Sequence, residues 1–291
     1  MPRTALLSLL ALIAIASYSP AQEQPFGVAT ENDVVYTKVG ETELKLDMAR
    51  PRDGNGLFPA LLVIHGGAWR AGNKADLRPL LLECAQRGYV AVSPQYRFCP
   101  KDVFPAQVHD VKAVVRWLRT NAAKYKVDGE HIGAVGFSAG GHLSLMLGLT
   151  DKEDGLEGDV PSDAPSSKVQ AVVNYFGPTD LAASDLPEVS RGLVNNFIGG
   201  GPAEKAEAFA KASPLTFVSK GDAAVLTFQG TKDPLVPDSQ ATKLANKMTA
   251  AGVSGRVELL IGAGHGWAGA ELDRTKAETF AFFDMHLKRP K

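Results

Sequence analysis

The stretch HIGAVGFSAGGHLSLMLGLT, residues 131–150, places a serine between glycines at the point where an apolar run becomes a helix-period segment. The run before Ser138 has the unbroken hydrophobicity of a strand buried on both faces of a sheet. The segment after it predicts a helix. Gly136, Ser138 and Gly140 fit the pattern G-x-S-x-G, in which small residues permit a sharp turn that exposes the serine hydroxyl. A plain glycine turn without chemistry is the alternative interpretation of these residues.

The rest of the chain repeats this alternation of apolar runs and helical segments. Further runs typical of buried strands are FPALLVIHGG (58–67), GYVAVSPQYR (88–97), VQAVVNYFGP (169–178), AAVLTFQGT (223–231) and RVELLIGAGH (256–265). Helix-period segments cover residues 76–88, 104–125, 139–150, 238–252 and 270–288. Strands and helices that alternate in this way form a mostly parallel sheet with helices on both faces, and such sheets bind ligands at the carboxyl ends of their strands.

Two kinds of segment depart from this alternation. DVVYTKVG (33–40) and TELKLDMARP (42–51) alternate apolar and polar residues, which predicts an antiparallel hairpin at one sheet edge and brings the sheet to about eight strands. The segments at about 150–168 and 178–213 are rich in Gly, Pro and acidic residues. Insertions at the carboxyl ends of strands commonly form lids or substrate walls, so we expect a small lid from these two segments.

The composition is that of one ordinary α/β domain. The chain has 291 residues, of which 45% are hydrophobic and 22% charged, and its formal net charge is −1. This balance favours neither nucleic acid nor an anionic membrane as a partner, and it suggests a small or neutral molecule. We therefore expect residues 22–291 to form a single domain.

The first residues predict an export signal. Arg3, an apolar stretch of about a dozen residues and the small residues before position 22 are typical of a secretory signal peptide over residues 1–21. An uncleaved membrane anchor is the alternative, although the apolar stretch is shorter than a spanning helix requires. We expect a periplasmic or secreted protein with no membrane contact after cleavage. In an oxidising compartment Cys84 and Cys99 are a candidate disulfide, and a buried free thiol at Cys84 is the alternative.

A serine needs a general base to act as a nucleophile, and His265 is the best-placed candidate. It lies in the glycine-rich stretch GAGHGW, directly after the last apolar run. The remaining histidines fall on predicted strands or helices, where packing or surface roles explain them; they are His65, His109, His131, His142 and His286. His142 is close to Ser138 along the chain, but it is interpreted as structural.

An acid must orient that base, and Asp233 is the preferred candidate. It follows the strand-like run at 223–231, and the order Ser138, Asp233, His265 is one of the known chain orders of a serine-hydrolase triad. Asp180 and Asp238 are the rivals, the first as an anchor for a lid and the second as a helix cap.

The stretch HGGAW, residues 65–69, follows the first buried run and can supply backbone N–H groups to a developing oxyanion. The N–H of Ala139, directly after the serine, is expected to face the same loop. A plain glycine turn is the alternative interpretation of this loop.

The motifs HGGAW, GFSAGGH, GTKDPLVP and GAGHGW together resemble those of the α/β-hydrolase esterases. The resemblance is to exported bacterial enzymes related to hormone-sensitive-lipase-like carboxylesterases and to feruloyl and acetylxylan esterases. It implies an α/β-hydrolase fold with Ser138 as nucleophile, His265 as base and Asp233 as orienting acid. It also implies oxyanion donors at Gly67, Ala68 and Ala139, with Ala68 standing where many relatives have a third glycine. Trp69 and Trp267 flank the implied site and are candidate substrate-binding residues; a buried aromatic without contact to substrate is the alternative for either.

The resemblance implies a serine esterase that forms an acyl-enzyme and needs neither a metal nor an organic cofactor. Short-acyl or carbohydrate-linked acetyl or feruloyl esters are the expected substrates. Amide hydrolysis, as in an arylformamidase or a peptidase-like enzyme, is the alternative reaction. A non-catalytic binding module with a hydrolase fold is a further alternative.

Overall fold

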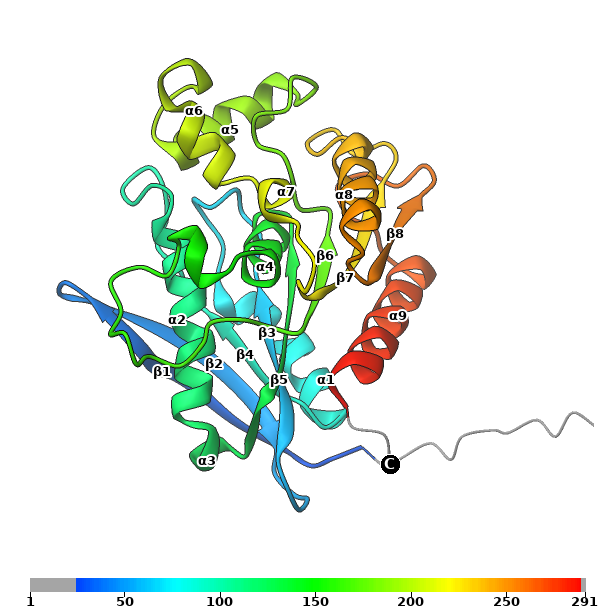
Figure 1. The fold of residues 1–291 in the computed structure, drawn as a ribbon. Helices are drawn as coiled ribbons and strands as arrows, with labels where there is room; N and C mark the ends of the chain where they lie inside the picture. Colours follow the sequence, from blue (N-terminus) through cyan, green and yellow to red (C-terminus); the bar gives the residue numbers. More distant parts are fainter. Residues whose placement is uncertain (1–24, 289–291) are drawn as a thin grey trace, which may run out of the picture.

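The computed structural model describes residues 25–288, in which eight strands form one twisted sheet (Figure 1). The order across the sheet is β1-β2-β4-β3-β5-β6-β7-β8. The pairs β1–β2 and β2–β4 are antiparallel, and all the others are parallel. This arrangement confirms the predicted mostly parallel sheet with a hairpin at one edge. The predicted signal peptide, residues 1–21, lies outside the described residues.

The strands are β1 (Val28–Val39), β2 (Thr42–Pro51), β3 (Phe58–Ile64), β4 (Val90–Pro94), β5 (Val127–Phe137), β6 (Ala171–Tyr175), β7 (Ala224–Gly230) and β8 (Gly255–Leu260). The α-helices are α1 (Arg78–Gln86), α2 (Ala106–Thr120), α3 (Ala122–Tyr125), α4 (Ala139–Leu149), α5 (Glu188–Ile198), α6 (Pro202–Lys211), α7 (Pro214–Phe217), α8 (Asp238–Ala251) and α9 (Ala270–Leu287). Two short 3-10 helices, η1 (Lys74–Leu77) and η2 (Lys152–Asp154), complete the described elements.

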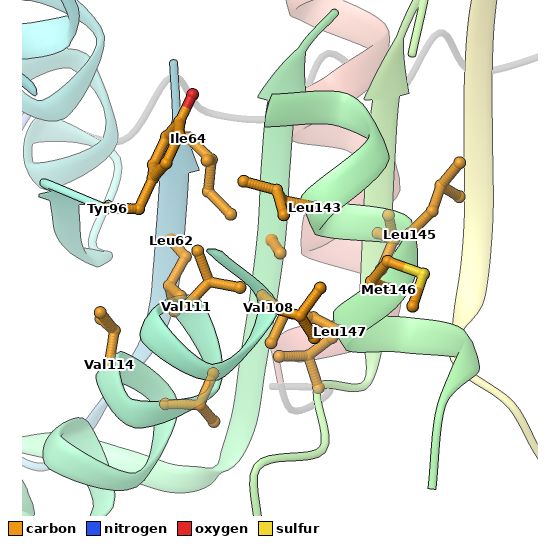
Figure 2. Close-up of a cluster of buried hydrophobic side chains, with 14 of the residues drawn as sticks. Leu62, Ile64, Tyr96, Val108, Val111, Val114, Leu143, Leu145, Met146 and Leu147 are labelled. Atoms are coloured by element: carbon orange, nitrogen blue, oxygen red, sulfur yellow. The ribbon is translucent and has the colours of Figure 1, made fainter. Parts of the chain in front are cut away.

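The central strands are mostly apolar because both of their faces are covered by helices. In β3, Leu62 and Ile64 join the core under α2 and α4, whereas Leu61 and Val63 join the core under α1 and α9. Figure 2 shows the first of these cores, where side chains of α2 and α4 meet those of β3. Alternate residues of a strand point to opposite faces, so a strand between two helical layers buries both sets of side chains. A polar side chain there needs a hydrogen-bond partner, as Gln229 of β7 finds in the Val236 carbonyl.

The last apolar run departs from the prediction of a strand buried on both faces. β8 pairs only with β7 and forms the edge of the sheet, and most of its residues are exposed or half-buried. Leu259 is 39% exposed, and Ile261, just past the strand, is 88% exposed. The hydrophobicity of a segment does not show whether it forms an edge strand or a central strand. Which strands pair with it depends on the tertiary fold.

The predicted lid at residues 150–168 is also wrong. This segment packs along α2 instead, where a Cβ on Gly158 would come within 3.1 Å of the His109 ring. Glu157 is fixed there by Lys112 and Arg116 of α2, at 2.5 Å and 2.8 Å. The second predicted insertion, residues 178–213, follows β6 at its carboxyl end and contains α5 and α6.

The two cysteines are both free and buried. Cys84 lies in the core under α1 and α9, whereas Cys99 lies in the core on the other side of the sheet. A disulfide between them is therefore excluded, and the buried-thiol alternative for Cys84 holds. Within residues 25–288, no helix combines the length and the hydrophobicity needed to cross a membrane.

Candidate active site

Ser138 occupies a strained turn between β5 and α4. Its φ and ψ are 54° and −120°, a conformation that costs a non-glycine residue about 1–3 kcal/mol. The flanking glycines make the turn possible: a Cβ on Gly136 would overlap the backbone of Gly140, and a Cβ on Gly140 would overlap the carbonyl of Ile64. The G-x-S-x-G spacing is therefore a steric requirement of this turn.

Two loops bring the predicted partners to this serine. The Oγ of Ser138 lies 2.9 Å from Nε2 of His265, and Nδ1 of His265 lies 2.7 Å from Oδ2 of Asp233. An ionised carboxylate only accepts hydrogen bonds, so Nδ1 donates to Asp233 and Nε2 is free to accept from the serine hydroxyl. This is the tautomer that a general base for Ser138 requires.

Asp233 is held rigidly behind His265, and its side chain is fully buried. The N–H groups of Leu235 and Val236 donate to Oδ1 at 2.8 Å and 2.9 Å, and Nε2 of Gln229 donates to Oδ2 at 3.1 Å. Burial alone would raise the pKa of Asp233, but the hydrogen bonds from His265, Val236 and Leu235 outweigh it and lower the pKa below its usual value. The carboxyl group therefore stays ionised beside the histidine.

The rival acids face elsewhere. Asp180 lies 3.5 Å from Nζ of Lys243 and accepts the N–H of Ala182. Asp238 is the first residue of α8 rather than its cap: Pro237 occupies the N-cap position, with no side-chain hydrogen bond. The charge of Asp238 still lies in the first turn, where it favours the helix dipole.

The HGGAW loop lies directly against the serine turn. A Cβ on Gly66 would come within 2.7 Å of the Phe137 carbonyl oxygen, so the close approach of the two loops requires glycine there. Gly67, Ala68 and Trp69 all have positive φ, at 113°, 51° and 57°. Gly67, Ala68 and Ala139, the predicted oxyanion donors, line the same cavity as Ser138. Ala139 is the first residue of α4, where backbone N–H groups have no partner within the helix.

A cavity of about 390 Å³ opens at Ser138 and His265. Its size suits a small organic ligand, and most of its walls are apolar. Wall residues that the sequence analysis did not identify come from the loops after β6 and β7 and from α5; they are Phe176, Pro178, Leu186, Ser190, Leu193, Val194, Leu235 and Val236. The amphipathic spacing of Ser190, Val194 and Phe197 was the available signal for α5, but it does not reveal which face meets a ligand.

The two predicted tryptophans have different positions. Trp69 lines the cavity and is only 3% exposed. Trp267 is not among the lining residues: its ring packs against Phe176 at 5.3 Å, and its Nε1 donates to Thr275 at 2.9 Å. Trp267 therefore does not form the wall of the cavity but supports Phe176. The rings of Phe176 and His265 lie with their centroids 4.7 Å apart.

Among residues 25–288, no three side chains of His, Cys, Asp or Glu gather as a metal site. The groups that meet at the cavity are a serine hydroxyl, an imidazole, a buried carboxylate and backbone amides. Such a set can activate the hydroxyl and stabilise an oxyanion.

Known proteins are similar to this chain in sequence and in fold. The BD-FAE family model matches residues 46–248. Esterase LipC of Mycobacterium tuberculosis is 33% identical over 219 residues, which are 72% of this chain and 53% of that protein. The chain thus spans about half the length of the curated relatives it matches.

Among solved structures, a truncated form of a carbohydrate esterase from gut microbiota has a TM-score of 0.77 and 28% identity, covering 91% of this chain and 99% of that one. The propionate-bound esterase Est2 of Thermogutta terrifontis has a TM-score of 0.75 and 26% identity, covering 90% of this chain and 96% of that one. The chain therefore belongs to the BD-FAE family and has the α/β-hydrolase fold of these esterases.

Proposed function

We propose that this protein is a carboxylic ester hydrolase that works through an acyl-enzyme on Ser138. The observation that carries the proposal is the continuous hydrogen-bond chain from Ser138 through His265 to Asp233, at 2.9 Å and 2.7 Å, at the mouth of an apolar cavity. A binding module has no need of a buried carboxylate that fixes the tautomer of a histidine beside a strained serine.

In the first half of the reaction, Oγ of Ser138 attacks the ester carbonyl while Nε2 of His265 takes the hydroxyl proton. The carbonyl oxygen becomes an oxyanion beside the N–H groups of Gly67, Ala68 and Ala139. When the tetrahedral intermediate collapses, His265 gives its proton to the departing alcohol. Water then attacks the acyl-enzyme, His265 takes a proton from that water, and Ser138 recovers it as the acid leaves.

We propose short-acyl or carbohydrate-linked acetyl or feruloyl esters as substrates. The BD-FAE family assignment and the likeness to a carbohydrate esterase support this class. The apolar cavity suits a short acyl chain or an aromatic ring. We further propose that the protein is exported, with residues 1–21 removed, which N-terminal sequencing of the mature protein checks.

The test compares wild type with Ser138→Ala on p-nitrophenyl acetate, butyrate and longer esters, on acetylated and feruloylated xylan, and on N-formylkynurenine. Wild type should hydrolyse short esters, and Ser138→Ala should lose several orders of magnitude in kcat. Faster turnover of N-formylkynurenine than of any ester would favour the amide-hydrolase alternative. No turnover by wild type, or full activity in Ser138→Ala, would refute the proposal.

A fluorophosphonate probe identifies the nucleophile independently of the substrate. Wild type should gain the mass of one adduct, and Ser138→Ala should gain none. Ser190 lines the same cavity, but its hydroxyl is engaged with the Leu235 carbonyl at 2.6 Å. Ser190→Ala is therefore the matched control, and it should still be labelled.

A further inference from the structure

His142 is a buried histidine beside the serine turn that the proposed reaction does not use. It lies on α4, one turn after Ser138, and is 0% exposed. Its Nε2 lies 2.7 Å from the carbonyl oxygen of Ala212, which only accepts, so Nε2 carries the proton. Its Nδ1 then accepts the indole N–H of Trp69 at 3.2 Å.

Trp69 ends the HGGAW loop and is held from two sides. Its ring stacks on Phe197 of α5, with centroids 4.3 Å apart and planes inclined by 14°. The His142 ring meets it edge-on, at 5.1 Å and 88°. Stacking restrains the tilt of the indole, and the hydrogen bond to His142 fixes its rotation within the stacking plane.

The loop that Trp69 ends needs such restraint. Gly67, Ala68 and Trp69 adopt positive φ in succession, and the two non-glycine residues occupy a region that L side chains rarely adopt. Backbone in these conformations persists only where surrounding contacts enforce it. The contacts on Trp69 are therefore suited to holding the amides of Gly67 and Ala68 in place.

We propose that His142 is a positioning residue for the oxyanion hole, acting through its hydrogen bond to the Trp69 indole. The inference rests on the proposed esterase function. Oxyanion donors act only when they are aimed at the tetrahedral oxygen, so a rotation of Trp69 that shifts the loop weakens transition-state binding more than substrate binding. Burial lowers the pKa of His142 to about 4, which keeps Nδ1 free to accept at neutral pH.

Two substitutions separate the two hydrogen bonds of His142. In His142→Asn, the amide oxygen stands where Nδ1 stood and still accepts from Trp69, while the bond to Ala212 is lost. In His142→Gln, the amide nitrogen stands where Nε2 stood and still donates to Ala212, while Trp69 loses its acceptor. A merely structural role for His142 predicts similar losses in both variants.

With p-nitrophenyl acetate, we expect His142→Gln to lower kcat on the order of 10- to 100-fold with KM little changed. His142→Asn should stay within about threefold of wild type, because it retains the bond that positions Trp69. Inhibition by butylboronic acid, which forms a tetrahedral adduct on a reactive serine, should weaken in His142→Gln in parallel with kcat.

Trp69→Phe removes the indole N–H and keeps an aromatic ring on Phe197, so it should reproduce the kcat loss. It also carries the test if His142→Gln does not fold. The double variant should be no worse than either single variant, because both remove the same hydrogen bond. Tyr89→Phe is the control: it removes a partly buried hydrogen bond of 2.6 Å to Asp284 of α9, and should lower Tm without changing kcat or boronate inhibition.

If wild type hydrolyses esters while His142→Gln keeps its kcat and its boronate affinity, the positioning role is refuted and the esterase function stands. Equal losses in His142→Gln and His142→Asn refute it as well. If wild type hydrolyses no ester, the proposed function fails first and the positioning role fails with it.

Discussion

Asp233 decides which nitrogen of His265 carries the proton. A carboxylate at 2.7 Å from Nδ1 requires a donor there, which leaves Nε2 as the acceptor that faces Ser138. We expect Asp233→Asn to lower kcat on p-nitrophenyl acetate on the order of 10⁴-fold with the fold intact, since an amide can donate to Nδ1 and favours the wrong tautomer. Asp238→Asn is the matched control and should keep wild-type kcat; a similar loss in both variants would contradict the assignment.

His142 should make the folded protein sensitive to acid. Burial lowers its pKa to about 4, against about 6.5 in the unfolded chain, so the unfolded state binds the proton more readily in this range. The free energy of unfolding should therefore decrease as pH falls from about 6.5 to about 4, by roughly 3 kcal/mol from this residue.

His142→Asn removes this titration but keeps an acceptor for Trp69. Urea denaturation at several pH values should show a shallower decline between pH 6.5 and 4 for the variant than for wild type. Parallel declines would mean that His142 is not the group that takes up the proton.

At the scale of elements, α5 shapes one wall of the cavity and should influence the acyl preference. Leu193 lines the cavity, whereas Val189, on the same helix, is 57% exposed and does not. Leu193→Trp fills part of the cavity, so we expect kcat/KM for p-nitrophenyl butyrate to decrease by about tenfold or more relative to that for acetate. Val189→Trp should leave the butyrate-to-acetate ratio unchanged. An unchanged ratio in Leu193→Trp would show that the acyl group does not occupy this part of the cavity.

The sequence predicted well those elements whose residue types are dictated by burial or by the steric limits of a turn. β3 and the second half of β5, residues 132–137, are apolar because helices cover both of their faces. The turn at Ser138 needs glycine at positions 136 and 140 for steric reasons. The burial of β8 was mispredicted because its position at the sheet edge depends on which strand pairs with it. The role of the segment 150–168 was mispredicted because its position depends on contacts with α2, which is far away in the sequence.

At the scale of the whole molecule, the segment 150–168 contributes to stability instead of covering the site. Lys112 is fully buried and Arg116 nearly so, and both depend on Glu157 for their charge balance. We expect Glu157→Gln to lower the free energy of unfolding by about 3 kcal/mol, since it leaves a buried lysine without a counter-charge, while kcat stays unchanged.

Urea denaturation and ester hydrolysis of the same preparation check both halves of this prediction. Glu153→Gln, at an exposed position of the same segment, should change neither quantity. A kcat loss in Glu157→Gln without a loss of stability would contradict a purely structural role for the segment.

The sequence by itself determined the order of the strands and of the helices α1, α2, α4, α8 and α9, the serine turn and the three residues that meet there. These features are encoded by hydrophobic period, by glycine sterics and by the rule that parallel strands end at one edge of a sheet. Only the tertiary structure decided that α5 walls the cavity, that Trp267 lies behind Phe176, and that His142 holds Trp69. Those contacts join side chains from distant parts of the chain, and their identity depends on how whole elements pack, which no local pattern records.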